Sequence, residues 1–209
     1  MNFEPTDDHR QLRDLIRGFL EAEVAPHGEK FEKAGELPRE ILGRLWSELG
    51  LGGMVIPEEY GGIGLDAVAY CLVVEEMARV WAALSITVAV HNSVGAGPIV
   101  EFGNEAQKRK YLPKLATEWI GAFSLSEPVS GSDAAALRTS AVRDGAHYVL
   151  NGEKNWVTTG GLANIYIVMA RTGADKQKGI SAFIVEKGTP GLTLTKTEEK
   201  MGLKASETR

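Results

Sequence analysis

Hydrophobic and polar positions follow two different patterns along the chain, and the change falls near residue 120. Before that point apolar residues recur at the spacing of helices. The first hydrophobic stripe consists of Leu12, Leu15, Ile16, Phe19 and Leu20. It predicts a helix over about residues 6–24. Pro26 is expected to end this helix, because the residue before a proline disfavours the helical conformation.

Further helices are predicted by the same spacing and by residues typical of helix ends. Pro38 suits the first position of a helix, and Gly50 suits the position after its last residue. The inward face of this helix consists of Ile41, Leu42, Leu45 and Leu49. Residues 66–81 and 82–90 are apolar almost all round, so both segments are expected deep in a helical bundle.

A last helix before residue 120 is predicted by a capping box, in which the side chains of Asn104 and Gln107 bond to each other's backbone N–H groups. Pro113 lies inside this segment and lacks the N–H that a helix uses. A kink or a break is therefore expected before Trp119.

After residue 120 the pattern is typical of strands. Asp144-Gly145 and Asn151-Gly152 suit tight hairpin turns, and the segments 147–150 and 155–158 beside them predict a three-stranded meander. Two further strands are expected over residues 165–170 and 180–185. The turn Thr189-Pro190-Gly191 is expected to precede a short strand over residues 192–195.

These blocks predict the α+β class, with an all-helical domain over residues 1–119 and a mainly antiparallel β domain over residues 120–209 that is incomplete at its C-terminal end. The chain has 209 residues, of which 44% are hydrophobic and 24% charged, a balance typical of folded domains. The net charge of −5 argues against a nucleic-acid surface. The densest basic run, Lys108-Arg109-Lys110, is expected on a solvated helix face.

Composition also bears on location and on the cysteine. The first 25 residues are too charged for a signal peptide, and polar residues interrupt the apolar stretch 81–100. A cytoplasmic protein without membrane insertion is expected. Cys71 is the only cysteine, so no intrachain disulfide can form. Its apolar neighbours predict a buried, inert thiol.

Several motif classes are excluded or disfavoured. Residues 62–67, Gly-Ile-Gly-Leu-Asp-Ala, match a degenerate dinucleotide-binding pattern, but helices rather than strands are predicted around it, which favours a turn between helices. The four histidines have no metal-like spacing, so no metal site is expected. No elbow motif marks a nucleophilic serine.

Residues 123–133, Phe-Ser-Leu-Ser-Glu-Pro-Val-Ser-Gly-Ser-Asp, leave a predicted strand and enter a loop rich in hydroxyl groups. Such a loop can hold a phosphate or the polar edge of a ring, and it can equally be a polar turn. The residues by themselves leave both interpretations open.

The run Phe123–Asp133 resembles the signature of the acyl-CoA dehydrogenase family. Three more segments resemble family motifs in the expected order: Pro57-Glu58-Glu59-Tyr60-Gly61-Gly62-x-Gly64-Leu65, Asn151-Gly152-x-Lys154-x-Trp156-Val157-Thr158 and Met201-Gly202-Leu203-Lys204-Ala205-Ser206-Glu207-Thr208. The spacing is most similar to the short-chain branch, although Val129 stands where many members have glycine. The resemblance covers essentially the whole chain and implies that the C-terminal helical bundle of the family is absent from it.

The resemblance implies an FAD site. Phe123, Leu125 and Ser126 would contact the flavin. Gly131 and Ser132 would meet its diphosphate or the bound thioester, which makes Ser132 the candidate for substrate binding. Within the segment 156–158, Trp156 would pack along the isoalloxazine and Thr158 would bond near N5, with Val157 between them. If residues 153–158 form one strand, Trp156 and Thr158 share a face.

The resemblance also implies the reaction, which removes a proton and a hydride from an acyl-CoA thioester to give trans-2-enoyl-CoA. The catalytic glutamate of the family lies in the C-terminal helical domain, so no catalytic residue is assigned in this chain, and Glu127 is expected to be structural. Implied partners are an acyl-CoA substrate, an electron-transfer flavoprotein as acceptor and further copies of the chain in a dimer of dimers. The alternatives are a catalytically silent flavin- or acyl-CoA-binding fragment and an acyl-CoA oxidase.

Overall fold

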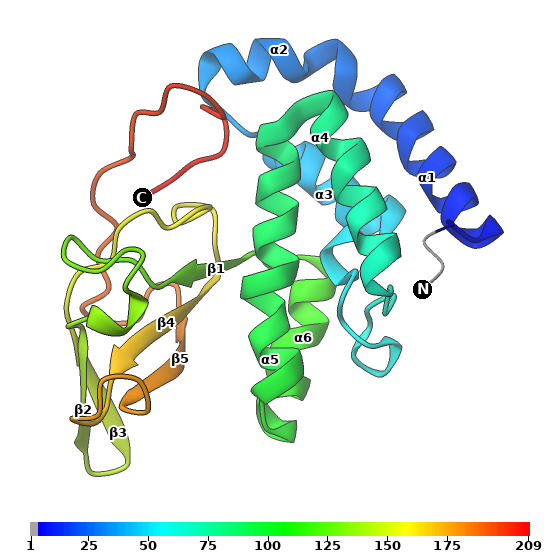
Figure 1. Ribbon diagram of the computed structural model, residues 1–209. Coiled ribbons are helices and arrows are strands. Elements are labelled where there is room, and N and C mark those ends of the chain that lie inside the picture. Colours follow the sequence, from blue (N-terminus) through cyan, green and yellow to red (C-terminus); the bar gives the residue numbers. More distant parts are fainter. Residues whose placement is uncertain (1–3) are drawn as a thin grey trace.

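The computed structural model of the chain describes residues 4–209. The helices of the first half are α1 (Asp7–Phe19), α2 (Ala25–Ala34), α3 (Arg39–Leu49), α4 (Ala67–Val90), α5 (Gly97–Phe102) and α6 (Glu105–Thr117). The strands of the second half are β1 (Gly121–Ser124), β2 (Ser140–Asp144), β3 (His147–Asn151), β4 (Ile165–Arg171) and β5 (Ile180–Glu186). In Figure 1 the sheet stands to one side of the helices, as the predicted α+β class requires.

The first helix begins where the sequence predicts, but its expected end at Pro26 is wrong. Thr6 caps α1, and a π-helical turn, Leu20–Val24, leads without interruption into α2. Pro26 lies in the first turn of α2, where a missing N–H costs little. The helical path ends at Gly35, whose φ of 69° is left-handed. α3 runs as expected from Pro38 to a left-handed Gly50.

α4 is a hairpin of two helices rather than one straight rod (Figure 1). At Trp81 the backbone leaves the helical region, with φ −155° and ψ 98°. The Tyr70 hydroxyl donates to the Ala89 carbonyl at 3.1 Å, and the Ser85 hydroxyl donates to the Val74 carbonyl at 2.8 Å. These bonds join the two arms of the hairpin side by side.

Two expectations in the helical part are wrong. Cys71 is exposed, because the buried stripe of the first arm of α4 runs through Ala69, Val73 and Met77 and leaves residue 71 on the other side. α6 also continues through Pro113 without a break. Leu112 and Leu115 are fully buried on either side of the proline, and their packing outweighs the lost backbone hydrogen bond.

The segment of residues 61–66 connects two helices, the short turn Glu58–Tyr60 and α4, as expected for the glycine pattern in it. Asp66 caps α4 through a bond from the Ala69 N–H at 2.8 Å. No strand precedes this loop within residues 4–66 of the described chain, so it lacks the frame of a dinucleotide-binding unit.

β4 is the central strand of the sheet. β5 pairs with one edge of β4 along its whole length and antiparallel, whereas β1 pairs in parallel with residues 165–168 on the other edge. β2 meets that same edge farther on, at the parallel pair Ser140–Arg171, and carries β3 as an antiparallel hairpin. The longest pairings are therefore antiparallel, as predicted.

The predicted meander has only two of its three strands. β2 and β3 form around Asp144-Gly145, but residues 152–157 are not a strand, and the N–H groups of Asn155 and Val157 bond to other segments described below. The short strand expected over residues 192–195 is also absent from the described chain. Leu192 and Leu194 instead pack against the cluster around Ala122 and Tyr166.

The helical part and the sheet share a core. One apolar cluster unites Ile99, Leu112 and Leu115 with Ile165 and Ile167 of β4. Gly95 and Gly121 approach so closely that a Cβ on Gly95 would lie 2.9 Å from the Cα of Gly121. The start of β1 is thus pressed against the turn that follows α4.

Buried His91 joins the two parts. Its Nε2 donates to the Gly52 carbonyl at 2.8 Å, and its Nδ1 accepts from the Gly121 N–H at 3.0 Å. Burial lowers the pKa of His91 to about 4, so the ring is neutral at pH 7. Two backbone groups from different halves of the chain therefore depend on one neutral imidazole.

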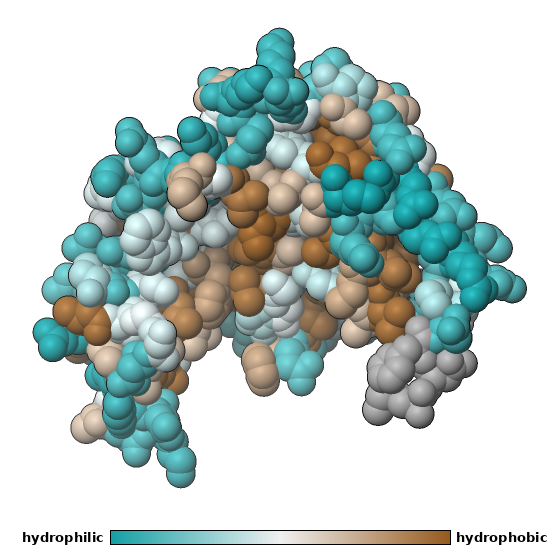
Figure 2. All heavy atoms as spheres, turned by 45° about the horizontal axis from the view of Figure 1, so that its top comes forward, coloured by the Kyte–Doolittle hydropathy of each residue, from teal (hydrophilic) through white to brown (hydrophobic). Residues whose placement is uncertain are grey.

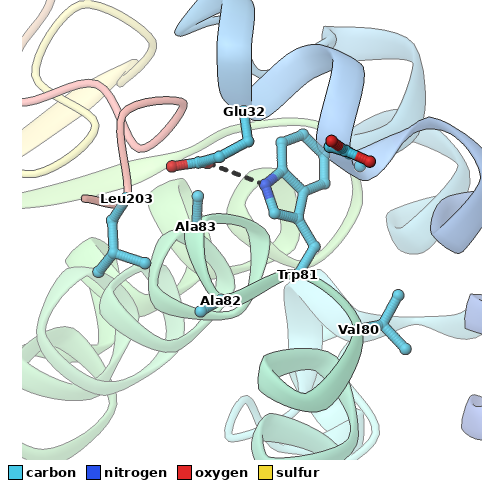
Figure 3. A pocket seen from close by; sticks show the side chains of 8 residues that line it. Glu32, Val80, Trp81, Ala82, Ala83 and Leu203 are labelled. Atoms are coloured by element: carbon cyan, nitrogen blue, oxygen red, sulfur yellow. Dashed lines mark hydrogen bonds between the residues drawn. The ribbon is translucent and has the colours of Figure 1, made fainter.

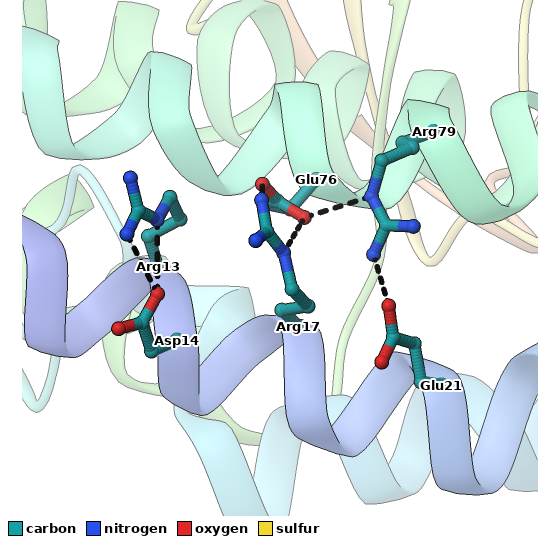
Figure 4. Close-up of polar contacts among 6 residues, drawn as sticks. All are labelled: Arg13, Asp14, Arg17, Glu21, Glu76 and Arg79. Atoms are coloured by element: carbon teal, nitrogen blue, oxygen red, sulfur yellow. Dashed lines mark hydrogen bonds and ion pairs between the residues drawn. The ribbon is translucent and has the colours of Figure 1, made fainter.

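A carboxylate network joins α1 to α4. Glu76, 5% exposed, accepts hydrogen bonds from Arg17 and Arg79, and Arg79 also pairs with Glu21 at 2.8 Å (Figure 4). Hydrogen bonds from Arg17 and then Arg79 lower the pKa of Glu76 in spite of its burial.

Some apolar side chains of the helices remain exposed. Figure 2 shows hydrophobic surface over the middle of the helical part, with hydrophilic surface around it. Val68, Ile86 and Phe102 are the exposed large hydrophobic residues of α4 and α5. This agrees with the nearly all-round apolar character of these helices.

Candidate functional site

Hydrogen bonds hold together the loop after β1, residues 125–132, and the segment of residues 154–158. Lys154 reaches across with its Nζ, which donates to the Leu125 carbonyl at 2.9 Å. Beside it, the Asn155 N–H donates to the Ser126 carbonyl at 2.8 Å. Neither segment is part of a strand, so these few bonds replace a sheet ladder. The structure thereby brings the two predicted flavin segments side by side.

Trp156 has a strained backbone and an exposed side chain. Its φ is 62°, a left-handed value that bulky residues rarely adopt, and its exposed fraction is 59%. Bonds on both sides impose this conformation: Asn155 is tied to Ser126, and the Val157 N–H donates to the Arg209 carbonyl at 2.7 Å. Strain of this kind, with an indole left in solvent, is typical of functional positions.

The prediction that Trp156 and Thr158 share a face assumed a strand over residues 153–158, and that strand is absent. The alternation of side chains along a strand therefore does not apply to these two residues. Thr158 is half-buried and forms an isolated antiparallel bridge with Thr208. Val157 is buried against Ala122 and Tyr166, so its side chain faces the apolar core.

Glu127 is the most strongly bound side chain of the loop. Its carboxylate accepts from Lys154 Nζ at 2.7 Å, from the Arg138 N–H at 2.6 Å and from the Thr139 N–H at 2.9 Å. Burial by itself would raise its pKa, but these donors outweigh burial and hold the pKa of Glu127 at about 2. The group is a fixed anion at neutral pH.

The remaining predicted site residues lie along the same loop. Phe123 is half-buried at the end of β1, and Leu125 and Ser126 follow it, half-buried as well. Gly131 and Ser132 are exposed, and neither forms a hydrogen bond to residues 154–158 in the described chain. A Cβ on Gly131 would meet nothing, so open space lies beside it.

Two contributors were not identified from the sequence. Lys154 belongs to the motif at residues 151–158. A lysine two residues before Trp156, in a segment expected to pack within the β domain, could have been recognised from the sequence as a candidate. The segment Lys204–Arg209 overlaps the motif at residues 201–208, but its position beside the site was not predicted. It lies against Val157–Thr159, where the Thr159 N–H donates to the Glu207 carbonyl at 2.7 Å, and its other end is bound to α2.

Two cavities of about 340 and 540 Å³ border α2, the smaller against residues 80–83 of α4 and Leu203, the larger against residues 161–162 and the C-terminal segment, and none of the predicted site residues lines them. In the smaller one Glu32 points toward Trp81, whose Nε1 donates to it at 3.0 Å (Figure 3). Glu32 also accepts from the Lys204 N–H at 2.6 Å. Since its carboxylate is already bound, we assign Glu32 an anchoring role.

Within residues 4–209 no helix has the length and apolar character to cross a membrane. No group of three or more His, Cys, Asp or Glu side chains in the same residues is arranged to hold a metal ion.

Comparisons with known proteins agree along the whole chain. Residues 6–118 match the family described as "Acyl-CoA dehydrogenase, N-terminal domain", and residues 122–209 match "Acyl-CoA dehydrogenase, middle domain". An acyl-CoA dehydrogenase of Bacillus subtilis is 47% identical over 205 residues, which cover 97% of this chain and 54% of that protein.

Solved structures give the same result. Butyryl-CoA dehydrogenase of Megasphaera elsdenii is 42% identical with a TM-score of 0.92, over 100% of this chain and 56% of that one. An acyl-CoA dehydrogenase of Bacillus anthracis complexed with FAD is 44% identical with a TM-score of 0.89, over 99% and 35%. A chain in a structure of the electron transferring flavoprotein of Acidaminococcus fermentans is 43% identical with a TM-score of 0.93, over 100% and 55%. The chain thus spans about half the length of most of these proteins.

Proposed function

This chain belongs to the acyl-CoA dehydrogenase family, close to its short- and branched-chain members, and from that premise we propose that it forms the FAD- and acyl-CoA-binding part of an α,β-dehydrogenase. The observation that carries the proposal is the junction of the loop after β1 with the segment that holds the strained, exposed Trp156. A flavin needs an aromatic wall and a few fixed polar groups, and these two segments offer both.

In this proposal the indole of Trp156 packs along the flavin ring, and the hydroxyl of Thr158 bonds near its N5. Phe123, Leu125 and Ser126 line the ring from the opposite segment. Bound FAD would supply the acceptor for the hydride that leaves the β-carbon of the thioester, while a base removes the α-proton.

Gly131 and Ser132 lie in open space at the end of the loop, where exposed N–H and hydroxyl groups suit a diphosphate or the thioester. Ser132 is the proposed substrate contact.

We propose that the base comes from outside these 209 residues. Glu127 is the carboxylate that joins the proposed flavin segments, and it is bound. Glu127 has a pKa of about 2 and three donors. Glu127 is therefore not free to take a proton from a substrate at neutral pH. Glu207 accepts from the Gly161 N–H at 2.5 Å and pairs with Arg209.

Partners of the whole protein are part of the same proposal. An electron-transfer flavoprotein is the proposed acceptor, in keeping with the related chain in the Acidaminococcus fermentans structure. Assembly into a homo-oligomer is proposed on family membership. The competing functions are an acyl-CoA oxidase and a silent binding fragment.

The test uses the complete natural protein reconstituted with FAD. Anaerobic addition of straight and branched acyl-CoA thioesters of increasing chain length should bleach the flavin absorbance. The Thr158→Val variant keeps the shape of the side chain and removes its donor, so its reductive step should be slower by about ten- to a hundredfold. Rapid reoxidation by oxygen would favour the oxidase, and FAD binding without bleaching by any thioester would favour the silent fragment. An unchanged rate in Thr158→Val removes Thr158 from the site.

A further inference from the structure

The two proposed flavin segments come from distant parts of the sequence and share few contacts. Two of the bonds between them come from a single group, Lys154 Nζ, which donates to the Leu125 carbonyl and to Glu127 Oε1. The third is the backbone bond from Asn155 to Ser126. Because the segments have no sheet ladder between them, the Lys154 side chain determines much of their separation.

We propose that Glu127 and Lys154 are a positioning pair, which sets the distance between the loop Leu125–Ser132 and the segment Trp156–Thr158 and so the width of the flavin site. The inference rests on the proposed function, since it concerns the same site. Neither residue is assigned a contact with the flavin or the substrate. Both act through the segments that they join.

Burial makes this contact hard to open. The side chains of Lys154 and Glu127 are only 10% and 4% exposed, so separating them would leave two charges without solvent. Glu127 is anchored on its far side by the N–H groups of Arg138 and Thr139, which directly precede β2. The pair therefore connects Lys154 to the residues that lead into the sheet as well as to the loop after β1.

A second ion pair on the same loop provides the matched comparison. Asp133 pairs with Lys176 at 2.9 Å, but these side chains are 58% and 66% exposed. Water can replace that contact at little cost, so it should not determine the geometry of the loop. Removing Lys176 deletes one ammonium group paired to the same loop, as removing Lys154 does.

The experiment measures FAD affinity by titrating the apoprotein of the complete natural protein well below its melting temperature, together with the visible flavin spectrum and the melting temperature without FAD. Lys154→Met should raise the dissociation constant for FAD by about tenfold or more, and Lys154→Arg, which keeps the charge and the donors, should restore it to within about threefold. Lys176→Met should leave it unchanged.

Glu127→Asp keeps both charges but shortens the contact by one methylene group, so it remains informative if Lys154→Met fails to fold. It should weaken FAD binding by about three- to tenfold and shift the flavin absorption band, because the spacing changes while the charge does not. The inference is overturned if Glu127→Asp and Lys154→Met lower the melting temperature but leave the FAD affinity and the flavin spectrum unchanged. The pair would then be merely structural, and the proposed function would stand. Absence of FAD binding by the unaltered protein would overturn the proposed function and this inference with it.

Discussion

Two buried carboxylates, Glu76 in the helical part and Glu127 in the β part, are stabilised in different ways. Glu76 is held by Arg17 and Arg79, whose side chains are 42% and 45% exposed (Figure 4). Glu127 is held by Lys154, which is 10% exposed, and by two backbone N–H groups. Water can solvate Arg17 and Arg79 if their contacts with Glu76 open, whereas it cannot reach Lys154.

The difference follows from what surrounds each group. Glu76 joins α1 to α4, which are regular helices that also share an apolar core through Ile16, Leu20 and Val73. Glu127 joins loops that have no helix and no strand ladder, apart from the isolated bridge between Glu127 and Ser130. A polar contact between helices supplements packing, but a polar contact between loops is a large part of what determines their arrangement. Polar substitutions should therefore cost more in the β part.

The strongest challenge to this comparison is Lys154→Met. The variant leaves the Glu127 carboxylate buried without its cation, which should reduce the free energy of unfolding by about 3–5 kcal/mol. Urea unfolding followed by circular dichroism measures the loss. A loss below about 1 kcal/mol would mean that water reaches Glu127 and that the two carboxylates are alike.

Acid unfolding sharpens the comparison. The pKa of Glu127 is about 2 in the folded chain against an ordinary value of 4.5, so the folded state binds fewer protons between these values. The stabilisation is fully present above pH 4.5 and is lost as the pH falls toward 2, at most about 3 kcal/mol. Glu127→Gln should flatten the dependence of stability on pH in that window.

The control for the acid experiment is His91, whose pKa is about 4 in the folded chain against 6.5. Stability should fall between pH 6.5 and 4 in both the parent and Glu127→Gln, because the unfolded state there binds the proton that buried His91 refuses. If stability depends on pH below 4.5 in the same way in Glu127→Gln as in the parent, Glu127 does not cause the loss of stability in acid.

The smallest expected effects come from the exposed partners. Glu76→Gln keeps an acceptor for the half-exposed Arg17 and Arg79, so it should cost only about 1–2 kcal/mol in the free energy of unfolding. Lys176→Met should change it by less than about 0.5 kcal/mol. The urea unfolding experiment measures both changes. A cost for Glu76→Gln equal to that of Lys154→Met would contradict the comparison.

Local patterns predicted much of the helical part. The stripe through Leu42 and Leu45, the left-handed Gly50 and the capping box of Asn104 with Gln107 all occur as expected. Each depends on residues only three to eight positions apart, because helical hydrogen bonds join residues that are close in the sequence. The resemblance in residues 123–133 identified the family for the same reason, because motif residues are adjacent in sequence.

Only the tertiary structure decided how distant segments meet. Asn151-Gly152 was expected to turn into a strand, but residues 154–157 bond to Leu125, Ser126 and Arg209, and Trp156 is left-handed as a result. The exposure of Cys71 and the continuity of α6 through Pro113 likewise depend on which neighbours pack against each helix. The sequence by itself determined the elements whose hydrogen bonds are local and the family of the chain. Folding decided the contacts between loops, because their energy depends on partners that no local pattern encodes.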